Sequence, residues 1–414
     1  MTERLKIAII GGGASGLISG YLLNEKHDIT LYEKDSILGG NVRTLNKNVL
    51  DTNLPKNIAI ENGVLGFSQN YYPKFHKLLH HLGTPYHSYK PSISLFANEQ
   101  FYPAKNTSYL NIKSFSELIS NSNFRKELQH LVESQKEFKK ILNQSNPYNQ
   151  SFSDYSTLKG PYKNYLQTLF MLSFSTPLEK VHQLPQTLLN PYLKSLPNST
   201  WSFVKGGVYS YLETLLSKSN MRLICDAKNL QISRSANNIK IKYRGEEHLY
   251  DSVIIATTPG SVKKLLTDMT TIENDIFSDM NDQTFKTIAH SDVSFYGRFK
   301  KAKKTPMDLF LNYNQIKKGY NTYQNNVYKL PSNVPYSFAY NLDNQILKDT
   351  IINETNHTVP LYAKNHDLKI KQIQSINGQN RTFFVGAYLE NGLHEGAVAS
   401  AMQIAQMLGG IILE

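Results

Sequence analysis

Glycines close to the amino end have the spacing that binds the phosphates of a dinucleotide. Residues 11–16 read GGGASG and follow an apolar run, Lys6 to Ile10, that is typical of a buried strand. In this G-x-G-x-x-G pattern, Gly11 allows a tight turn, Gly13 lets the backbone approach a pyrophosphate, and Gly16 permits close packing of helix on strand. Free N–H groups at the start of the following helix attract negative charge.

A carboxylate stands where such a site needs one. Asp28 to Tyr32 predicts a second strand, and Glu33 follows it, twenty residues after Gly13. A carboxylate there accepts hydrogen bonds from both ribose hydroxyls of an adenosine and repels a 2′-phosphate. Glycines alone would be weak evidence, but strand, helix and acid together predict a dinucleotide-binding unit.

The residues after Glu33 favour a flavin over a nicotinamide. The stretch from Glu33 to Thr44 reads EKDSILGGNVRT. It resembles the extended fingerprint of the flavin amine oxidase superfamily, in which the acid is followed by five residues, Gly-Gly, two residues, Arg, and Ser or Thr. The resemblance implies that Gly39 and Gly40 bring backbone amides to the pyrophosphate of FAD and that Arg43 adds positive charge.

The match to this fingerprint is incomplete at two positions. Amine oxidases often carry Arg where this chain has Ile37 and Asn41. The resemblance therefore leaves one positive partner of the pyrophosphate unassigned.

Further segments extend the resemblance. Glu61-Asn62-Gly63 is similar to an acid-x-Gly segment that runs beside the flavin ring, and Tyr250 to Pro259 is similar to the strand that closes the nucleotide-binding sheet. An edge strand around Asn229 would hold the adenine through its backbone.

The carboxyl-terminal segment resembles the last strand, loop and helix of these flavoproteins. Thr382 to Ala387 predicts a buried strand, and Gly396 to Leu408 predicts a helix. In the superfamily this helix points its amino end at the flavin pyrimidine and stabilises negative charge on the reduced ring. The resemblance and motifs together imply FAD as cofactor and these cofactor-binding residues: Gly11, Gly13, Ala14, Ser15, Gly16, Glu33, Lys34, Gly39, Gly40, Arg43, Thr44, Gly63, Val64, Leu65, Asn229, Ala256, Thr257, Gly386, Glu395, Gly396, Ala397 and Val398.

The predicted fold is α/β, or α+β overall, with two domains. A discontinuous, Rossmann-like FAD-binding domain of the glutathione-reductase and amine-oxidase type is expected at residues 1–90, 195–270 and 375–414. A substrate-binding domain of mixed sheet and helices is expected at residues 91–194 and 271–374.

Within the substrate-binding domain, the sequence predicts three features. Residues 112–143 read as an amphipathic helix, Pro161 to Phe174 as an aromatic-rich helix, and Phe285 to Tyr340 as short alternating strands.

No catalytic triad is evident in the sequence, and the catalytic residues stay unassigned. His394 and His290 are the two candidates, the latter alternating on a strand with Asp292, where a paired charge is the more ordinary interpretation. His76 and His80 have helical metal-ligand spacing but lack a third ligand, so no metal is expected.

Composition restricts the class of protein and its partners. The 414 residues are 40% hydrophobic, carry a formal net charge of +12 and include one cysteine, Cys225. A globular chain without an intramolecular disulfide is expected, in a reducing, cytoplasmic compartment. No apolar run is long enough for a membrane span, although peripheral membrane contact stays open. A small-molecule substrate of amphiphilic or anionic character is expected and no nucleic acid; the oligomeric state is left open.

Three functions fit these features. The first is an FAD-dependent, amine-oxidase-like oxidoreductase that takes a hydride from a substrate C–H to flavin N5. The second is a flavin-dependent isomerase, desaturase or saturase of an unsaturated fatty-acyl or polyene substrate. The third is a non-catalytic FAD-binding module, favoured by the missing arginines at Ile37 and Asn41. The motifs around Gly392 to Gly396 also resemble a bacterial branch of NAD/FAD-binding, amine-oxidase-like proteins.

Overall fold

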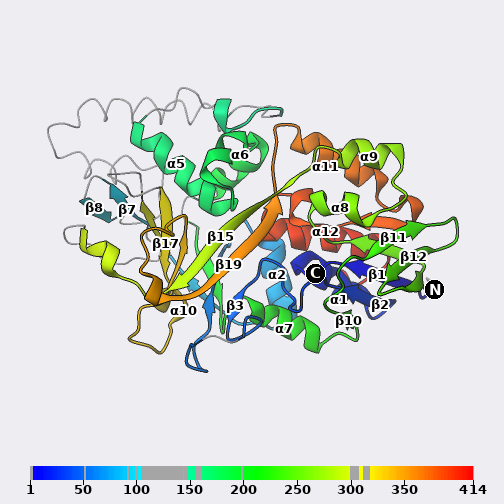
Figure 1. Ribbon diagram of the computed structural model, residues 1–414, viewed down its shortest axis with the longest axis horizontal. Coiled ribbons are helices and arrows are strands. Elements are labelled where there is room, and N and C mark those ends of the chain that lie inside the picture. Colours follow the sequence, from blue (N-terminus) through cyan, green and yellow to red (C-terminus); the bar gives the residue numbers. More distant parts are fainter. Residues whose placement is uncertain are drawn as a thin grey trace.

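The computed structural model describes residues 3–50, 53–90, 93–97, 100–103, 143, 148–154, 160–196, 199–298, 307–310 and 318–413. Both ends of the chain lie in the half of the molecule that contains β1, while a second sheet occupies the other half (Figure 1). Apart from residue 143, the expected helix at residues 112–143 lies outside the described residues.

A five-stranded parallel sheet forms the first half. Its order is β10-β2-β1-β14-β20, and every neighbouring pair runs parallel. The strands are β10 (Arg222–Ile224), β2 (Asp28–Tyr32), β1 (Lys6–Ile10), β14 (Ser252–Ile255) and β20 (Thr382–Phe384). Segments from the start, middle and end of the chain therefore share one sheet.

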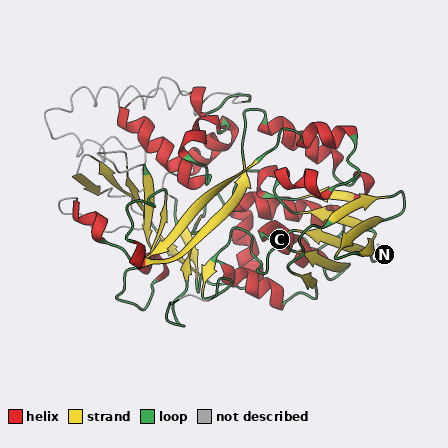
Figure 2. Cartoon of the chain, viewed as in Figure 1, coloured by secondary structure: helices red, strands yellow, loops and turns green. Residues whose placement is uncertain are grey.

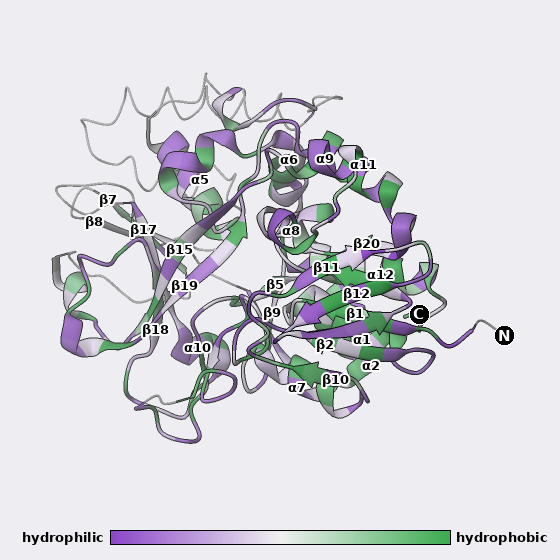
Figure 3. Ribbon diagram, turned by 45° about the vertical axis from the view of Figure 1, so that its right-hand side comes forward, coloured by the Kyte–Doolittle hydropathy of each residue, from purple (hydrophilic) through white to green (hydrophobic). Residues whose placement is uncertain are grey.

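Helices and a small antiparallel sheet cover this parallel sheet, as parallel sheets require. Four helices pack against one another: α1 (Ala14–Leu23), α2 (Pro73–Leu82), α7 (Tyr209–Ser217) and α12 (His394–Met407). A second group contains β11 (Gln231–Arg234), β12 (Ile239–Tyr243), β13 (Glu246–Tyr250), α8 (Pro259–Leu265), α9 (Thr271–Phe277) and α11 (His366–Ile376). Hydrophobic residues concentrate in and around the strands of this half (Figure 3).

A seven-stranded sheet forms the second half. Its order is β19-β15-β18-β17-β16-β7-β8, antiparallel except between β16 and β7. The strands are β19 (Ile351–Pro360), β15 (Asp282–His290), β18 (Ser337–Tyr340), β17 (Gly319–Tyr323), β16 (Met307–Phe310), β7 (Ile93–Ala97) and β8 (Gln100–Pro103). The long strands β15 and β19 form a ribbon that extends from this sheet toward the first half (Figure 2).

Smaller elements complete the described fold. They are helices α5 (Gly160–Ser173), α6 (Gln186–Ser195) and α10 (Gln324–Tyr328), the pair β3 (Thr44–Leu45) and β4 (Ile60–Glu61), and the sheet of β5 (Phe67–Ser68), β9 (Trp201–Val204) and β6 (Tyr86–Tyr89).

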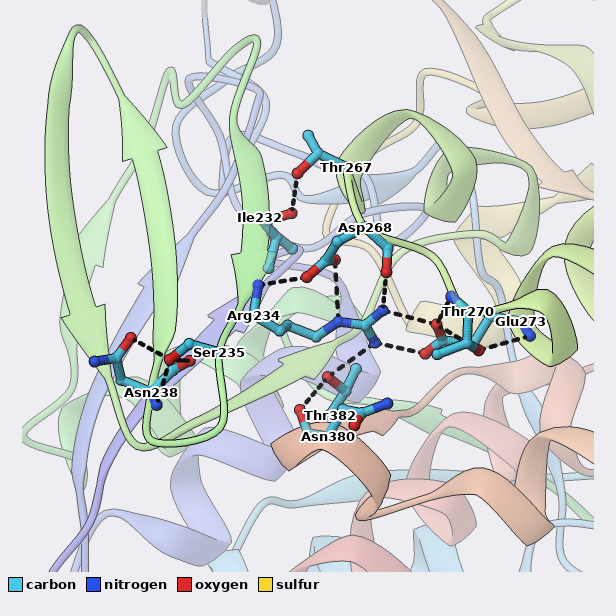
Figure 4. Close-up of polar contacts among 10 residues, drawn as sticks. All are labelled: Ile232, Arg234, Ser235, Asn238, Thr267, Asp268, Thr270, Glu273, Asn380 and Thr382. Atoms are coloured by element: carbon cyan, nitrogen blue, oxygen red, sulfur yellow. Dashed lines mark hydrogen bonds and ion pairs between the residues drawn. The ribbon is translucent and has the colours of Figure 1, made fainter.

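A buried ionic cluster fastens β11 to α9 and β20. The Arg234 guanidinium donates to both carboxylate oxygens of Glu273, at 2.5 and 2.7 Å, and to Asp268 at 3.1 Å (Figure 4). Thr382 on β20 lies 3.5 Å from the same guanidinium. Thr270 and Glu273 form a capping box at the start of α9, so the cluster also fixes that helix.

The predicted α/β fold with a Rossmann-like parallel sheet is confirmed, with two differences in detail. The edge strand is β10, and Asn229 lies beyond it in a turn with a φ of 58°, a left-handed conformation that a regular strand does not contain. The last helix begins at His394, two residues before Gly396. The division into two domains stays a prediction, although the parallel sheet takes its strands from the three ranges expected.

No helix among the described ranges combines the length and the apolar character needed to cross a bilayer.

Candidate dinucleotide-binding site

Four loops leave the same edge of the parallel sheet. Because β2, β1, β14 and β20 run parallel, their carboxyl ends meet at one edge, where Glu33, Gly11, Ala256 and Val385 follow them directly. Three strand spacings separate β2 from β20, which is roughly 14 Å. Ligands of open α/β sheets bind outside this edge. The arrangement is therefore a row of loops suited to an extended ligand.

The glycines of the first loop are needed for close packing. Gly11 has a φ of 113°, and a Cβ on it would lie 2.7 Å from the carbonyl oxygen of Ala256. A Cβ on Gly16 would overlap the carbonyl oxygen of Gly11 and lie 3.1 Å from the Ala256 Cβ. Side chains at either position would push α1 away from β14.

Two glycine turns touch at the amino end of α1. The N–H of Gly39 donates to the carbonyl of Gly12 at 2.8 Å, and a Cβ on Gly40 would lie 2.9 Å from the Cα of Gly13. No side chain caps α1, which begins at Ala14. The first N–H groups of a helix have no partner within it. This cradle, which a Cβ would fill, fits a phosphate group of a dinucleotide.

Ala14, Ser15 and Gly16 form the first turn of α1, where the unpartnered N–H groups of a helix lie. Ser15 is buried, and its carbonyl accepts a hydrogen bond from the Ser19 hydroxyl at 2.8 Å.

Glu33 retains acceptor capacity for a ribose. Its carboxylate accepts hydrogen bonds from the N–H of Gly12 at 2.6 Å and the N–H of Asp35 at 2.9 Å. A carboxylate has about four lone-pair sites, so roughly two stay free for the ribose hydroxyls. The N–H of Ala227 donates to the Glu33 carbonyl at 2.8 Å, so the chain leading to Asn229 starts beside Glu33.

Lys34 and Cys225 flank this carboxylate differently. Lys34 is exposed and lies 3.7 Å from the carboxylate of Asp35. Burial raises the pKa of the Cys225 thiol, and the negative charge of Glu33 raises it further.

Arg43 and Thr44 have different environments. The Arg43 side chain is 12% exposed, lies 3.9 Å from the Asp35 carboxylate, and has a pKa lowered by burial despite the attraction of Asp35 and Glu33. Thr44 is fully buried, and its hydroxyl donates to the Glu61 carboxylate at 2.9 Å and accepts from the N–H of Tyr209 at 3.1 Å. The Thr44 side chain therefore binds α7 and β4.

The acid-x-Gly segment, residues 61–63, packs tightly against neighbouring segments. Glu61 is fully buried, accepts from the N–H of Val208 at 2.6 Å, and has a pKa raised to about 8 by burial. A Cβ on Gly63 would overlap the carbonyl oxygen of Asn41, so this glycine lets the segment pack against the Gly-Gly turn.

Val64 and Leu65 are half-buried and pack against the main core. The carbonyl of Leu65 accepts a hydrogen bond from the Tyr328 hydroxyl on α10.

The loops after β14 and β20 are tied to their neighbours. The N–H of Ala256 donates to the carbonyl of Ile10 at 2.8 Å, and the Thr257 hydroxyl donates to the carbonyl of Thr258 at 3.2 Å. The N–H of Gly386 donates to the Ser400 hydroxyl on α12 at 3.0 Å.

Side chains that the sequence did not single out organise the start of α12. Glu395, Gly396 and Ala397 lie in its first turn, and Val398 follows them. The Asn391 side-chain oxygen accepts a hydrogen bond from the N–H of Gly396 at 2.9 Å and thus caps the helix. In the sequence, only the presence of an Asn just before the helix could have indicated this cap.

The Glu395 side chain binds a different helix. Its carboxylate accepts from the N–H groups of Lys74 and Phe75, at 2.8 and 3.0 Å, and so caps the amino end of α2. Burial raises the pKa of Glu395, which these bonds oppose.

Of the two candidate histidines, His290 is buried in the core and His394 is half-buried. His394 contacts the Tyr211 hydroxyl at 2.8 Å and the Phe75 ring, and burial lowers its pKa to about 3. His290 lies 2.8 Å from the side-chain oxygen of Asn321, and burial lowers its pKa to about 4. The Asp292 carboxylate accepts backbone N–H groups instead of the His290 ring.

No group of three or more His, Cys, Asp and Glu side chains could hold a metal ion within the part of the chain that the structure describes.

Comparisons with known proteins agree with this geometry. The family model of the NAD(P)-binding Rossmann-like domain matches residues 9–82. A search of curated proteins found no match. Cyclohexylamine oxidase from Brevibacterium oxydans IH-35A is 10% identical, with a TM-score of 0.69 over 98% of each chain.

Two further solved structures share the fold. A CLA-producing fatty acid isomerase from P. acnes is 14% identical, with a TM-score of 0.68 over 98% of this chain and 99% of that chain. A putrescine oxidase is 11% identical, with a TM-score of 0.67 over 99% of each chain. Residues 9–82 therefore match the NAD(P)-binding Rossmann-like domain, and nearly the whole chain has the same fold as these three solved structures.

Proposed function

We propose that this protein is an FAD-dependent oxidoreductase that removes a hydride from a substrate C–H. The observation that carries the proposal is the contact between the turns at Gly13 and Gly40, in a row of loops that begins at Glu33 and ends at the start of α12. An NAD site needs the first turn and the acid, whereas the second glycine turn and the α12 loop suit the longer FAD.

The chain's own residues would bind and orient this cofactor. Glu33 would hold the ribose, the N–H groups at the start of α1 the pyrophosphate, and the first turn of α12 the pyrimidine. FAD bound there would supply a two-electron acceptor. Residues 1–90, 195–270 and 375–414 would make up the cofactor domain, and residues 91–194 and 271–374 would bind the substrate.

A specific observation also supports a second reaction, redox-neutral isomerisation or saturation of an unsaturated acyl chain. The fatty acid isomerase is as similar in fold as the amine oxidases. Lys318, beside β17, is half-buried and donates to Gln167 on α5 at 2.7 Å. Its pKa is lowered by burial and by the nearby charge of Lys163. Two neighbouring cations would attract a carboxylate.

Colour and anaerobic reduction test these proposals in order. Purified protein should be yellow, with FAD close to one per chain. Amines that bleach the bound flavin without oxygen would support the oxidase, whereas conversion of an unsaturated fatty acid without net bleaching would support the isomerase. Lys318→Met should raise KM for the fatty acid and leave KM for an amine unchanged.

Colourless protein that rejects added FAD would overturn both reactions. Yellow protein that no amine reduces and that changes no unsaturated acid would instead support a non-catalytic FAD-binding module.

A further inference from the structure

We propose that His357, on the ribbon strand β19, carries a proton when FAD is bound and supplies the positive charge that the fingerprint lacks at Asn41. The inference rests on the proposed FAD site and concerns how the chain completes it. His357 is separated from Asn41 by 316 residues, yet the His357 Nδ1 lies 3.3 Å from the Asn41 side-chain oxygen.

His357 lies beside the cofactor cradle. A Cβ on Gly63 would lie 3.1 Å from the His357 Cε1 and would overlap the carbonyl of Asn41. Asn41 directly follows Gly40, whose backbone touches Gly13. The partner of this imidazole is therefore the residue next to the contact between the glycine turns.

The hydrogen-bonding geometry favours an imidazolium. The His357 Nε2 lies 2.9 Å from the carbonyl oxygen of Asn62, which can only accept, and 2.9 Å from the Thr287 hydroxyl, which itself donates to that carbonyl at 3.0 Å. A hydrogen on Nε2 therefore suits both oxygens. The Nδ1 faces the side-chain oxygen of Asn41, because the Asn41 side-chain nitrogen donates to the carbonyl of Thr358 at 3.0 Å.

Each neutral form of the ring leaves one close contact without a hydrogen. With Nε2 unprotonated, Nε2 can accept from the Thr287 hydroxyl 2.9 Å away, but it also lies 2.9 Å from the Asn62 carbonyl oxygen. With Nδ1 unprotonated, its lone pair faces an oxygen. Reversing the Asn41 amide would bring that oxygen against the Thr358 carbonyl instead. A second ring proton removes the conflict, because Nδ1–H donates to Asn41 while Nε2–H donates to Asn62.

The charges around the ring oppose protonation without a ligand. Burial lowers the pKa of His357 to about 4, and the charge of Arg43 lowers it further. From β15, the ring meets Phe285 and Thr287, which are uncharged. Lys286 alternates onto the other face and pairs there with Glu354.

The remaining acid near this turn is Glu61, next to Asn62. Its pKa of about 8 keeps it neutral near pH 7. No anion among the described neighbours of His357 therefore balances a proton, whereas the pyrophosphate of FAD carries negative charge. Binding FAD should raise the pKa of His357 and draw one proton from solvent onto Nδ1.

Proton uptake on FAD binding tests the inference. Calorimetric titration of apoprotein with FAD, in two buffers of different ionisation enthalpy near pH 6.5, should show uptake approaching one proton for the wild type. His357→Gln should remove this uptake. A matched control is His76→Gln, on α2, since His76 is half-buried and, like His357, has a pKa lowered by burial; this variant should retain the uptake.

The pH dependence of affinity gives a second readout. Between the low pKa of the free protein and the raised pKa of the bound state, the wild-type Kd for FAD should rise by up to about tenfold per pH unit, because one proton is taken up on binding in that range. Asn41→Arg would supply a fixed charge and should flatten this dependence. The variant keeps the test informative if His357→Gln fails to fold.

The outcomes separate the two proposals. FAD binding with equal proton uptake in the wild type and in His357→Gln would overturn the role of His357 and leave the FAD site standing. An apoprotein that gives no binding heat and no retained FAD would overturn the site itself.

Discussion

Gly40 is the residue at which one added methyl group should affect cofactor binding most selectively. Its φ is 58°, and a Cβ there would press against Gly13. Gly40→Ala should weaken FAD binding by at least about tenfold, or 1.4 kcal/mol, because the two turns must separate. Equilibrium titration followed by flavin fluorescence measures the change.

Gly245 provides the matched control for that variant. It also has a positive φ, of 82°, but a Cβ there would meet nothing within 4 Å. Gly245→Ala should cost about 1 kcal/mol of stability through backbone strain and leave FAD affinity at the wild-type value. Equal FAD affinities in the two alanine variants would contradict a phosphate site at Gly40.

Glu61 should make stability depend on pH. Its folded-state pKa of about 8 lies above the ordinary value of 4.5, so between these values the folded chain holds a proton that the unfolded chain releases. Stability should therefore fall as pH rises from about 4.5 to about 8. Glu61→Gln, which stays neutral, should flatten this slope and unfold at higher urea concentration than the wild type above pH 8.

Glu213, which is half-buried, is the control for this measurement. It pairs with Lys47 at the surface. Glu213→Gln should keep the wild-type slope, and a Glu61→Gln slope as steep as the wild type would refute the assignment to Glu61.

Among the elements, α9 and β11 depend on the Arg234 cluster (Figure 4). The side chains of Arg234 and Glu273 are 4% and 5% exposed. Arg234→Met should destabilise the fold by about 3–5 kcal/mol, because Glu273 would be left buried without its partner. Replacing both residues by apolar ones should restore part of that loss. Chemical denaturation measures each variant.

An exposed pair offers the contrast. The side chains of Lys240 and Glu247 are 43% and 52% exposed, and their charged atoms lie 2.9 Å apart. Lys240→Met should therefore lower the free energy of unfolding by less than about 1 kcal/mol. An equal loss of stability in the lysine and arginine variants would contradict the buried cluster.

The contribution of Arg234 should also depend on pH. Burial raises the pKa of Glu273, but Arg234 and Thr270 outweigh burial and hold this pKa below 4.5. The stabilisation by Arg234 should therefore disappear as pH falls below about 4.5.

Elements with local signals were predictable from sequence, whereas their long-range partners were not. β1, α1 and β2 follow from an apolar run, fixed glycine spacing and the acid at Glu33. The Asn391 cap and the contact of His357 with Asn41 depend on segments brought together only by folding. His394 looked available for chemistry because periodicity does not show that Tyr211 and Phe75 enclose it.

At the scale of the whole molecule, the parallel sheet brings distant segments of the chain together at one ligand-binding edge. β2 ends at Tyr32 and β20 ends at Phe384, yet both strands lie in one sheet. The ribbon of β15 and β19 brings His357 to the same turn from the second half. Cofactor binding should consequently stabilise both halves together.

Hydrogen exchange with and without FAD tests this convergence most directly. FAD should slow amide exchange in all four loops at once: residues 11–16, 33–43, 256–257 and 386–398. Protection restricted to the first two loops would indicate that the protein binds only the adenosine and phosphate half of FAD. Unchanged exchange in every loop at saturating FAD would contradict the proposed site.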